Sequence, residues 1–147
     1  MQAIEKAIQL AAVRHDGQVD KAGEPYILHP LSVMFRVRKA GADILTQIAA
    51  VLHDVLEDTE TTAEEIEEQF GPEVAAAVIA LTREPGESYQ AYIQRTAMNS
   101  IARRVKVADL EDNLDLRRSS WASTAKENET LLSLRRRYVT ALKALME

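Results

Sequence analysis

Apolar residues recur along this chain with the spacing of amphipathic α-helices. The first instance is at residues 2–15, where one helical face would carry Ile4, Ala7, Ile8, Ala11 and Ala12. Alternation with a period of two, which indicates half-buried strands, is scarce, and the chain has only four Tyr, two Phe and one Trp. The pattern therefore predicts an all-α fold of about seven or eight helices.

Helix caps and chain breakers set the expected bounds of the other helices. Asp43 is a good N-cap, and the helix that follows it is apolar on most of its faces, which places it centrally in the core. Capping boxes are expected at Thr62 with Glu65, or one residue earlier, and at Thr124 with Glu127. With these boundaries, further helices are expected at about residues 30–40, 43–56, 62–69, 72–82 and 89–98. Another is capped by Asn99 or Ser100 and carries Asp109 and Asn113, and the last begins at about residue 125.

The composition limits the class of protein. The chain has 147 residues, and no repeat or linker divides it, so a single domain over residues 1–147 is expected. It has no cysteine, which excludes disulfide scaffolds, thiolate metal sites and cysteine nucleophiles. There is no signal peptide and no apolar run of roughly 20 residues, so we expect a cytoplasmic protein with no membrane partner.

The charge of the chain narrows its expected partners. The formal net charge is −5, which argues against nucleic acid as a partner because nucleic-acid binders normally present a basic surface. A nucleotide substrate stays compatible with this charge, since a metal ion and a few local Lys or Arg side chains can bind phosphate. The sequence leaves a homo-oligomer open.

His53 and Asp54 stand side by side at the end of the apolar segment 49–52. The apolar neighbours predict burial, and a buried carboxylate needs a cation or hydrogen-bond donors. A divalent metal ion bound by both residues would meet that need. Glu57 and Asp58 follow one helical turn later, so three carboxylates crowd one region. One of them could orient or deprotonate water at the metal, although Glu57 and Asp58 could instead form a solvated helix end.

Asp109 lies among apolar residues of a later predicted helix and could supply a further metal ligand. Asn113 lies one turn after it and could face a substrate. His29 precedes Pro30 at a loop-to-helix junction, from which an imidazole can project into a site formed by other helices. The candidate ligands are therefore His29, His53, Asp54 and Asp109. This set has no sulfur, so it suits Mn²⁺ best and Fe²⁺ or Mg²⁺ next, and ligand type alone does not exclude Zn²⁺.

The order and spacing of these residues resemble the HD-domain phosphohydrolases. More specifically, about residues 3–116 are similar to the hydrolase domain of the Rel/Spo alarmone enzymes and its free-standing small versions. The segments that carry the resemblance are Arg14-His-Asp-Gly-Gln18, Gly23-Glu-Pro-Tyr-Ile-Leu-His-Pro30, Leu52-His-Asp-Val-Leu-Glu-Asp-Thr59, Phe70-Gly-Pro-Glu-Val74 and Val105-Lys-Val-Ala-Asp109.

The resemblance implies a single-domain helical HD-type fold and a Mn²⁺-dependent hydrolase. Its expected substrate is guanosine 3′,5′-bis(diphosphate), known as ppGpp, or its pentaphosphate, from which it would remove the 3′-pyrophosphate. The implied roles are metal binding by the four residues named above, positioning and activation of water by Glu57 and Asp58, and substrate binding by Lys21 and Asn113.

One departure from the family pattern keeps alternatives open. Asp20 precedes Lys21, whereas the family often has Arg at that position. This favours, as an alternative, an HD phosphohydrolase that acts on a different nucleotide or on a phosphorylated cofactor. A non-catalytic nucleotide-binding HD domain is the other alternative, and the presence of both Glu57 and Asp58 weighs against it.

Overall fold

The structure, a computed structural model, describes residues 1–115 and 125–147, with side chains of the second part described from residue 129. In these residues the chain is helical, and the sole β pairing among them is an isolated bridge between Val19 and Pro25. The predicted all-α fold is confirmed. The helices are α1 (Ala3–Arg14), α2 (Leu28–Lys39), α3 (Ile44–Val51), α4 (Val55–Asp58), α5 (Ala63–Phe70), α6 (Pro72–Ala80), α7 (Tyr89–Ala97), α8 (Ser100–Asn113) and α9 (Ala125–Met146).

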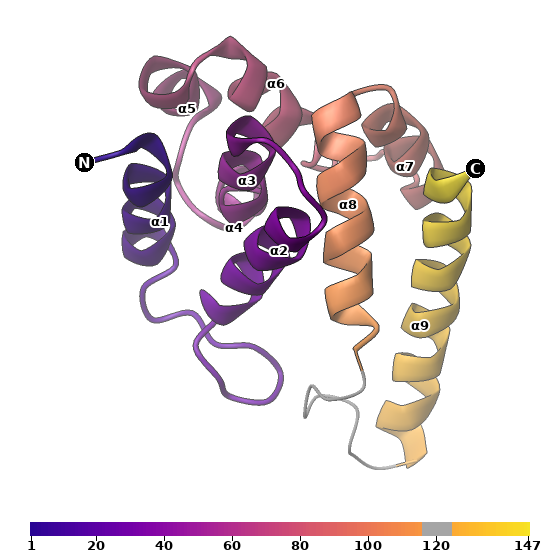
Figure 1. Cartoon of the computed structure of the whole chain (residues 1–147). Helices are drawn as coiled ribbons and strands as arrows, with labels where there is room; N and C mark the ends of the chain where they lie inside the picture. Colours follow the sequence, from indigo (N-terminus) through magenta and orange to yellow (C-terminus); the bar gives the residue numbers. More distant parts are fainter. Residues whose placement is uncertain (116–124) are drawn as a thin grey trace.

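Helices α2, α3 and α8 pack against one another in the middle of the fold (Figure 1). Helix α1 covers one side of α3, and the pair α5 and α6 lies over the end of this central group. Helices α7 and α9 pack on the opposite side of α8. None of the helices in the described part of the chain is both long and apolar enough to cross a membrane.

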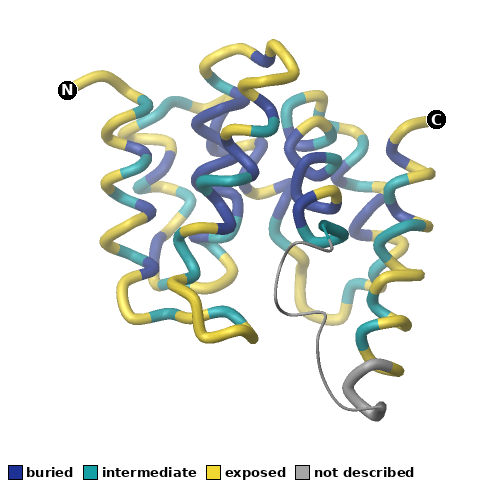
Figure 2. The backbone as a smooth tube through the Cα atoms, turned by 60° about the horizontal axis from the view of Figure 1, so that its bottom comes forward, coloured by how far each residue is buried: buried dark blue, intermediate teal, exposed yellow. Residues whose placement is uncertain are grey.

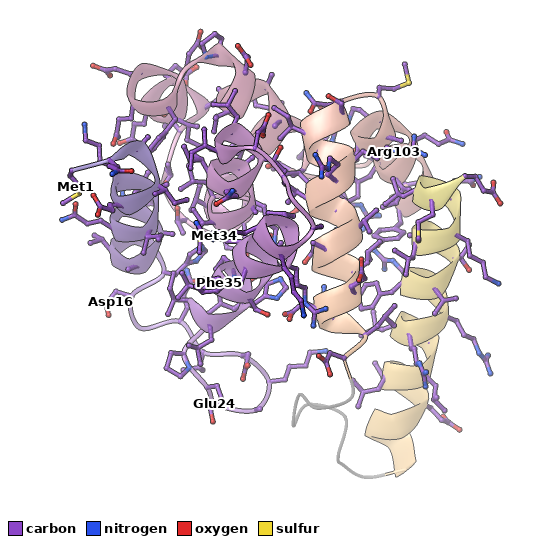
Figure 3. The ribbon with its side chains drawn as sticks, in the orientation of Figure 1. Met1, Asp16, Glu24, Met34, Phe35 and Arg103 are labelled. Atoms are coloured by element: carbon purple, nitrogen blue, oxygen red, sulfur yellow. The ribbon has the colours of Figure 1, made fainter. Side chains whose placement is uncertain are left out.

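The buried residues concentrate on the central helices, as the tube in Figure 2 shows. The larger apolar cluster joins α1, α2, α3, α6 and the first half of α8, and a smaller one joins α7, α8 and α9. Helix α2 buries one face, since Met34 is 4% exposed and its neighbour Phe35 is 59% exposed (Figure 3). The sequence pattern had placed residues 43–56 in the centre of the core, and Ile48 to Leu52 are indeed buried there.

The prediction of one continuous helix over residues 43–56 is wrong. Helix α3 ends at Val51, and α4 begins at Val55. In the interruption, the Ala50 carbonyl accepts the backbone N–H of His53 at 3.4 Å and the imidazole Nδ1–H of His53 at 2.7 Å. In a continuous α-helix the Ala50 carbonyl would accept the backbone N–H of Asp54, but here it accepts the His53 imidazole. The helix therefore ends at the two residues that were predicted to bind metal.

The predicted N-cap at Asp43 is confirmed, and it supports the helix that leads to His53. Its Oδ1 accepts hydrogen bonds from the backbone N–H of Thr46 at 2.9 Å and from its hydroxyl at 2.7 Å. The capping box of Thr62 and Glu65 at α5 is also confirmed, whereas the one predicted at Thr124 lies outside the described residues.

Replacing Asp43 with alanine is expected to lower the free energy of unfolding by about 1 kcal/mol, because two orphaned groups at the start of α3 lose their acceptor. Urea unfolding of the two proteins measures this difference. Asp43→Asn, whose side-chain oxygen can still cap the helix, is the control and should stay close to the original protein. Equal losses in both variants would mean that the charge, rather than the cap, matters.

Candidate metal centre

Three elements bring the predicted histidine and aspartate ligands together. His29 lies in the first turn of α2, His53 in the break between α3 and α4, and Asp109 in α8. One ligand atom of each lies within 4.8 Å of the other two, and all three side chains are buried. The site therefore forms where the three central helices meet.

The imidazole of His53 is held in an orientation that suits a metal ligand. Its Nδ1 donates to the Ala50 carbonyl, which can only accept, so Nδ1 carries the proton. Its Nε2 is buried without a hydrogen-bond partner and lies 3.0 Å from Asp54 Oδ2 and 3.4 Å from Asp109 Oδ1. A nitrogen lone pair facing two carboxylate oxygens is repelled by them unless a positive charge lies between. A divalent cation is suited to that position.

The pKa shifts of His53 and Asp54 also indicate a position for a cation. Burial lowers the pKa of His53, but Asp54 and Asp109 outweigh it and raise that pKa well above its ordinary value. Burial raises the pKa of Asp54, but His53 outweighs it and lowers that pKa to about 2. Both shifts have one cause: the carboxylates favour a positive charge beside them. A proton on His53 can provide that charge, and so can a bound cation.

The other imidazole, that of His29, is oriented by a residue that the sequence reasoning did not assign. His29 Nε2 lies 2.8 Å from Asp109 Oδ1, and its Nδ1 lies 2.7 Å from Asp112 Oδ2. Asp112 in turn accepts hydrogen bonds from Ser32 Oγ at 2.6 Å and Arg36 Nε at 3.2 Å. The Asp112 carboxylate on Nδ1 holds the ring so that Nε2 points toward Asp109, the orientation that a metal-ligating imidazole needs. The available signal was a second aspartate three residues after Asp109 in the same helix.

Exchanging Asp112 for asparagine is expected to weaken Mn²⁺ binding by about 10- to 100-fold, because His29 loses the charged partner that fixes its ring. Calorimetric titration of the metal-free protein with Mn²⁺ measures the change. Glu111→Gln removes the same charge from an exposed neighbour on α8 and serves as the matched control. An Asp112→Asn variant that binds Mn²⁺ as the control does would remove Asp112 from the metal centre.

Asp54 joins the buried ligands to a second group of carboxylates. Oxygen atoms of Asp54, Glu57 and Asp58 lie within 4.8 Å of one another, and the hydroxyl of Tyr26 donates to Asp54 Oδ2. Glu57 and Asp58 are exposed. Partial burial of the Asp58 carboxyl, with Asp54 and Glu57 close by, raises its pKa to about 6, so this carboxyl can exchange a proton near neutral pH.

Asp109 is the most heavily contacted carboxylate of the group. Besides the two imidazoles, Lys106 Nζ lies 2.8 Å from its Oδ2, and Asn113 Nδ2 donates to its Oδ1 at 3.2 Å. Burial raises the pKa of Asp109, but Lys106 and the histidines hold it well below its ordinary value. Asp109 therefore stays ionised, as a metal ligand must.

A cavity of about 510 Å³ opens onto this group of residues. His29, Asp54 and Asp109 line it, and so do the catalytic candidates Glu57 and Asp58. The predicted substrate residues Lys21 and Asn113 line it as well, from the loop before α2 and from the end of α8; other lining residues come from α7 and α9 and include Tyr89, Tyr92, Leu131, Leu134, Arg137 and Tyr138.

Asp20, the departure noted in the sequence, serves the loop that carries Lys21. Its Oδ1 accepts the backbone N–H groups of Ala22 at 2.8 Å and Glu24 at 3.0 Å. Such Asx-type turns fix a loop locally. His15, in the first of the segments that carry the family resemblance, is buried beside the Tyr26 ring, with ring centroids 5.1 Å apart.

The chain is similar to known proteins in sequence and in fold. A family model described as HD domain matches residues 7–107. A relative from Aquifex aeolicus named guanosine-3′,5′-bis(diphosphate) 3′-pyrophosphohydrolase is 42% identical over 126 residues, which are 80% of this chain and 18% of the relative. A GTP pyrophosphokinase from Streptomyces coelicolor is 38% identical over 120 residues, which are 78% of this chain and 14% of that protein.

The curated relatives are thus several times longer than this chain. A solved structure is of more comparable size: it is a metazoan ortholog of SpoT, described as hydrolysing ppGpp and having a role in starvation responses. It superimposes with a TM-score of 0.76 at 30% identity, covering 97% of this chain and 86% of that one.

Proposed function

This chain belongs to the HD domain family, whose members depend on metal ions, and we propose that it hydrolyses guanosine 3′,5′-bis(diphosphate), or the corresponding pentaphosphate, to pyrophosphate and GDP or GTP. We further propose that residues 1–147 act as one hydrolase unit. The observation that carries the proposal is the buried Nε2 of His53, which faces the carboxylates of Asp54 and Asp109 with no hydrogen-bond partner among the described residues.

The proposed metal ligands are His29, His53, Asp54 and Asp109. Two imidazoles and two carboxylates with no thiolate suit Mn²⁺ best, with Fe²⁺ or Mg²⁺ as the next choices. The fit is supported by the chemistry of the donors: each imidazole has one nitrogen held by an acceptor, and its other nitrogen faces the ligand group. A divalent cation bound there supplies Lewis acidity toward phosphoryl oxygens.

Glu57 and Asp58 are proposed to position the attacking water and to take its proton. The oxygen of that water forms a bond to the phosphorus next to the ribose 3′-oxygen, the bond between that phosphorus and the 3′-oxygen breaks, and the 3′-oxygen ends as a hydroxyl. Pyrophosphate and GDP are the products. Asp58, with its pKa of about 6, is suited to passing a proton between water and the leaving oxygen near neutral pH.

Lys21 and Asn113 are proposed to bind the substrate from two sides of the cavity. Lys21 provides a positive charge on the loop that Asp20 holds in place. The Asn113 amide, which already donates to Asp109, can present its oxygen to a sugar or base.

The test is release of pyrophosphate from guanosine 3′,5′-bis(diphosphate) by the Mn²⁺-loaded protein, with a chelator-treated sample beside it. We expect equal amounts of GDP and pyrophosphate, and no release after chelation. Metal-loaded protein that releases nothing from this nucleotide would overturn the proposed substrate.

A second candidate is a different phosphorylated nucleotide or nucleotide cofactor, and one observation favours it. Asp20, where the family often has arginine, lines the cavity with a carboxylate and accepts from the backbone of its own loop, so this position cannot bind a phosphate as an arginine would. The same assay with nucleotides phosphorylated at the 2′- or 3′-position separates the two candidates. Faster turnover of one of these than of guanosine 3′,5′-bis(diphosphate) would support the second.

A further inference from the structure

Two arginines, Arg83 and Arg137, line the cavity. They come from later parts of the chain than the loop that carries Lys21. Arg137 of α9 lies over the ring of Tyr89, with its guanidinium carbon 3.6 Å from the ring centroid. Arg83, in the segment before α7, lies 5.9 Å from the same centroid. All three residues line the cavity. A guanidinium stacked on an aromatic ring keeps its N–H edge available for an anion.

Neither guanidinium group forms a salt bridge within the described part of the chain, although the Glu87 carboxylate lies close enough to Arg83 for its charge to help lower the Glu87 pKa. No carboxylate there lies within ion-pair distance of either one, and both side chains are exposed. Arg83 Nε donates to the carbonyl of Glu87 at 2.9 Å, which fixes the side chain and leaves its terminal nitrogens for another acceptor. In a chain of net charge −5, two arginines that line a cavity and form no salt bridge with the described residues provide a place for an anionic ligand.

This cationic pair is separate from the metal ligands. Lys106 contacts Asp109 at 2.8 Å and lies 5.1 Å from the centroid of the Tyr92 ring. The Tyr92 and Tyr89 rings follow, with centroids 5.9 Å apart, and Arg137 stacks beyond them. An anion on the arginines and an anion at the metal ligands therefore occupy different parts of one cavity.

We propose that Arg83 and Arg137, held by Tyr89, form a second anion-binding site for the distal phosphate of a nucleotide that is phosphorylated at both ends of its ribose. This inference rests on the proposed function, in which the 3′-phosphates go to the metal ligands, and it assigns the 5′-phosphates to the arginines. The site selects for nucleotides with two separated anionic groups. It also supplies, from α7 and α9, positive charge that Asp20 does not supply from the loop.

The experiment compares two ligands that differ only in the 5′-phosphate: guanosine 3′,5′-bisphosphate and guanosine 3′-monophosphate. Neither carries a pyrophosphate, so a pyrophosphohydrolase does not consume them. Calorimetry with the Mn²⁺-loaded protein gives both affinities for the original chain, for Arg137→Gln and for Arg83→Gln. The matched control is Arg136→Gln, which removes an exposed neighbouring arginine that does not line the cavity. Thermal unfolding checks that each variant is folded.

We expect the original chain to bind the bisphosphate more tightly than the monophosphate. Arg137→Gln and Arg83→Gln should each weaken bisphosphate binding by about tenfold to a hundredfold, as for loss of a charged hydrogen bond, with little effect on the monophosphate. Arg136→Gln should change neither affinity. In turnover of guanosine 3′,5′-bis(diphosphate), the same variants should raise KM far more than they lower kcat.

The proposal is overturned if the original chain does not prefer the bisphosphate, or if Arg137→Gln weakens both ligands equally or neither. It is also overturned if Arg136→Gln has the same effect. Failure of the proposed function looks different: the chain would not release pyrophosphate from guanosine 3′,5′-bis(diphosphate), yet the preference for the bisphosphate would still depend on Arg137.

Discussion

Asp54→Asn is expected to lose bound Mn²⁺ and to lose hydrolytic activity by about a thousandfold or more, because several kcal/mol of transition-state stabilisation depend on the metal. The substitution keeps the size of the side chain and an oxygen that can accept from Tyr26. It removes the negative charge that faces Nε2 of His53 at 3.0 Å. Loss of charge at that point weakens the attraction for a divalent cation more than it disturbs packing.

The measurement is metal content of the purified protein together with the rate of pyrophosphate release. Asp16→Asn is the matched control, because Asp16 is an exposed aspartate in the loop after α1 that does not line the cavity (Figure 3). His53→Ala should behave as Asp54→Asn does. A variant of either ligand that keeps both its metal and its rate would show that the metal binds elsewhere.

Glu57→Gln is expected to retain Mn²⁺ and to lose about 10²- to 10⁴-fold in kcat, the usual contribution of a general base. Glu57 is exposed at the cavity and lies in the carboxylate group with Asp54 and Asp58, whereas the buried ligands are untouched by the change. The amide cannot take a proton from water, so the loss should appear in kcat with metal binding preserved.

Metal content and steady-state kinetics of the same preparation separate this prediction from the first. Glu60→Gln, which changes an exposed glutamate just beyond α4, is the control and should keep the original rate. If Glu57→Gln also keeps that rate while Asp58→Asn loses it, the role of base belongs to Asp58 alone.

The helical class and most helix bounds could be read from the sequence because they depend on local chemistry. The apolar stripe at residues 3–14, the cap at Asp43 and the capping box at Thr62 each involve residues within one or two turns of each other. The candidate ligands were found the same way, since a histidine–aspartate pair in an apolar segment is costly without a cation whatever the fold around it. Asp109 and His29 were added to this pair because of their positions in an apolar helix and at a loop-to-helix junction, and the family resemblance then supported the set of four.

The tertiary structure decided what depends on residues far apart in sequence. In the break at Leu52 to Asp54 the His53 imidazole donates to the nearby Ala50 carbonyl, but its other nitrogen faces Asp109 of α8, which only packing brings close. The role of Asp112 depends on α2 packing beside α8, which brings together atoms 83 residues apart. Arg137 and Tyr89 meet for the same reason, because α7 and α9 both pack on α8. Side chains with several available partners take the ones that packing brings close, and packing is a property of the whole chain.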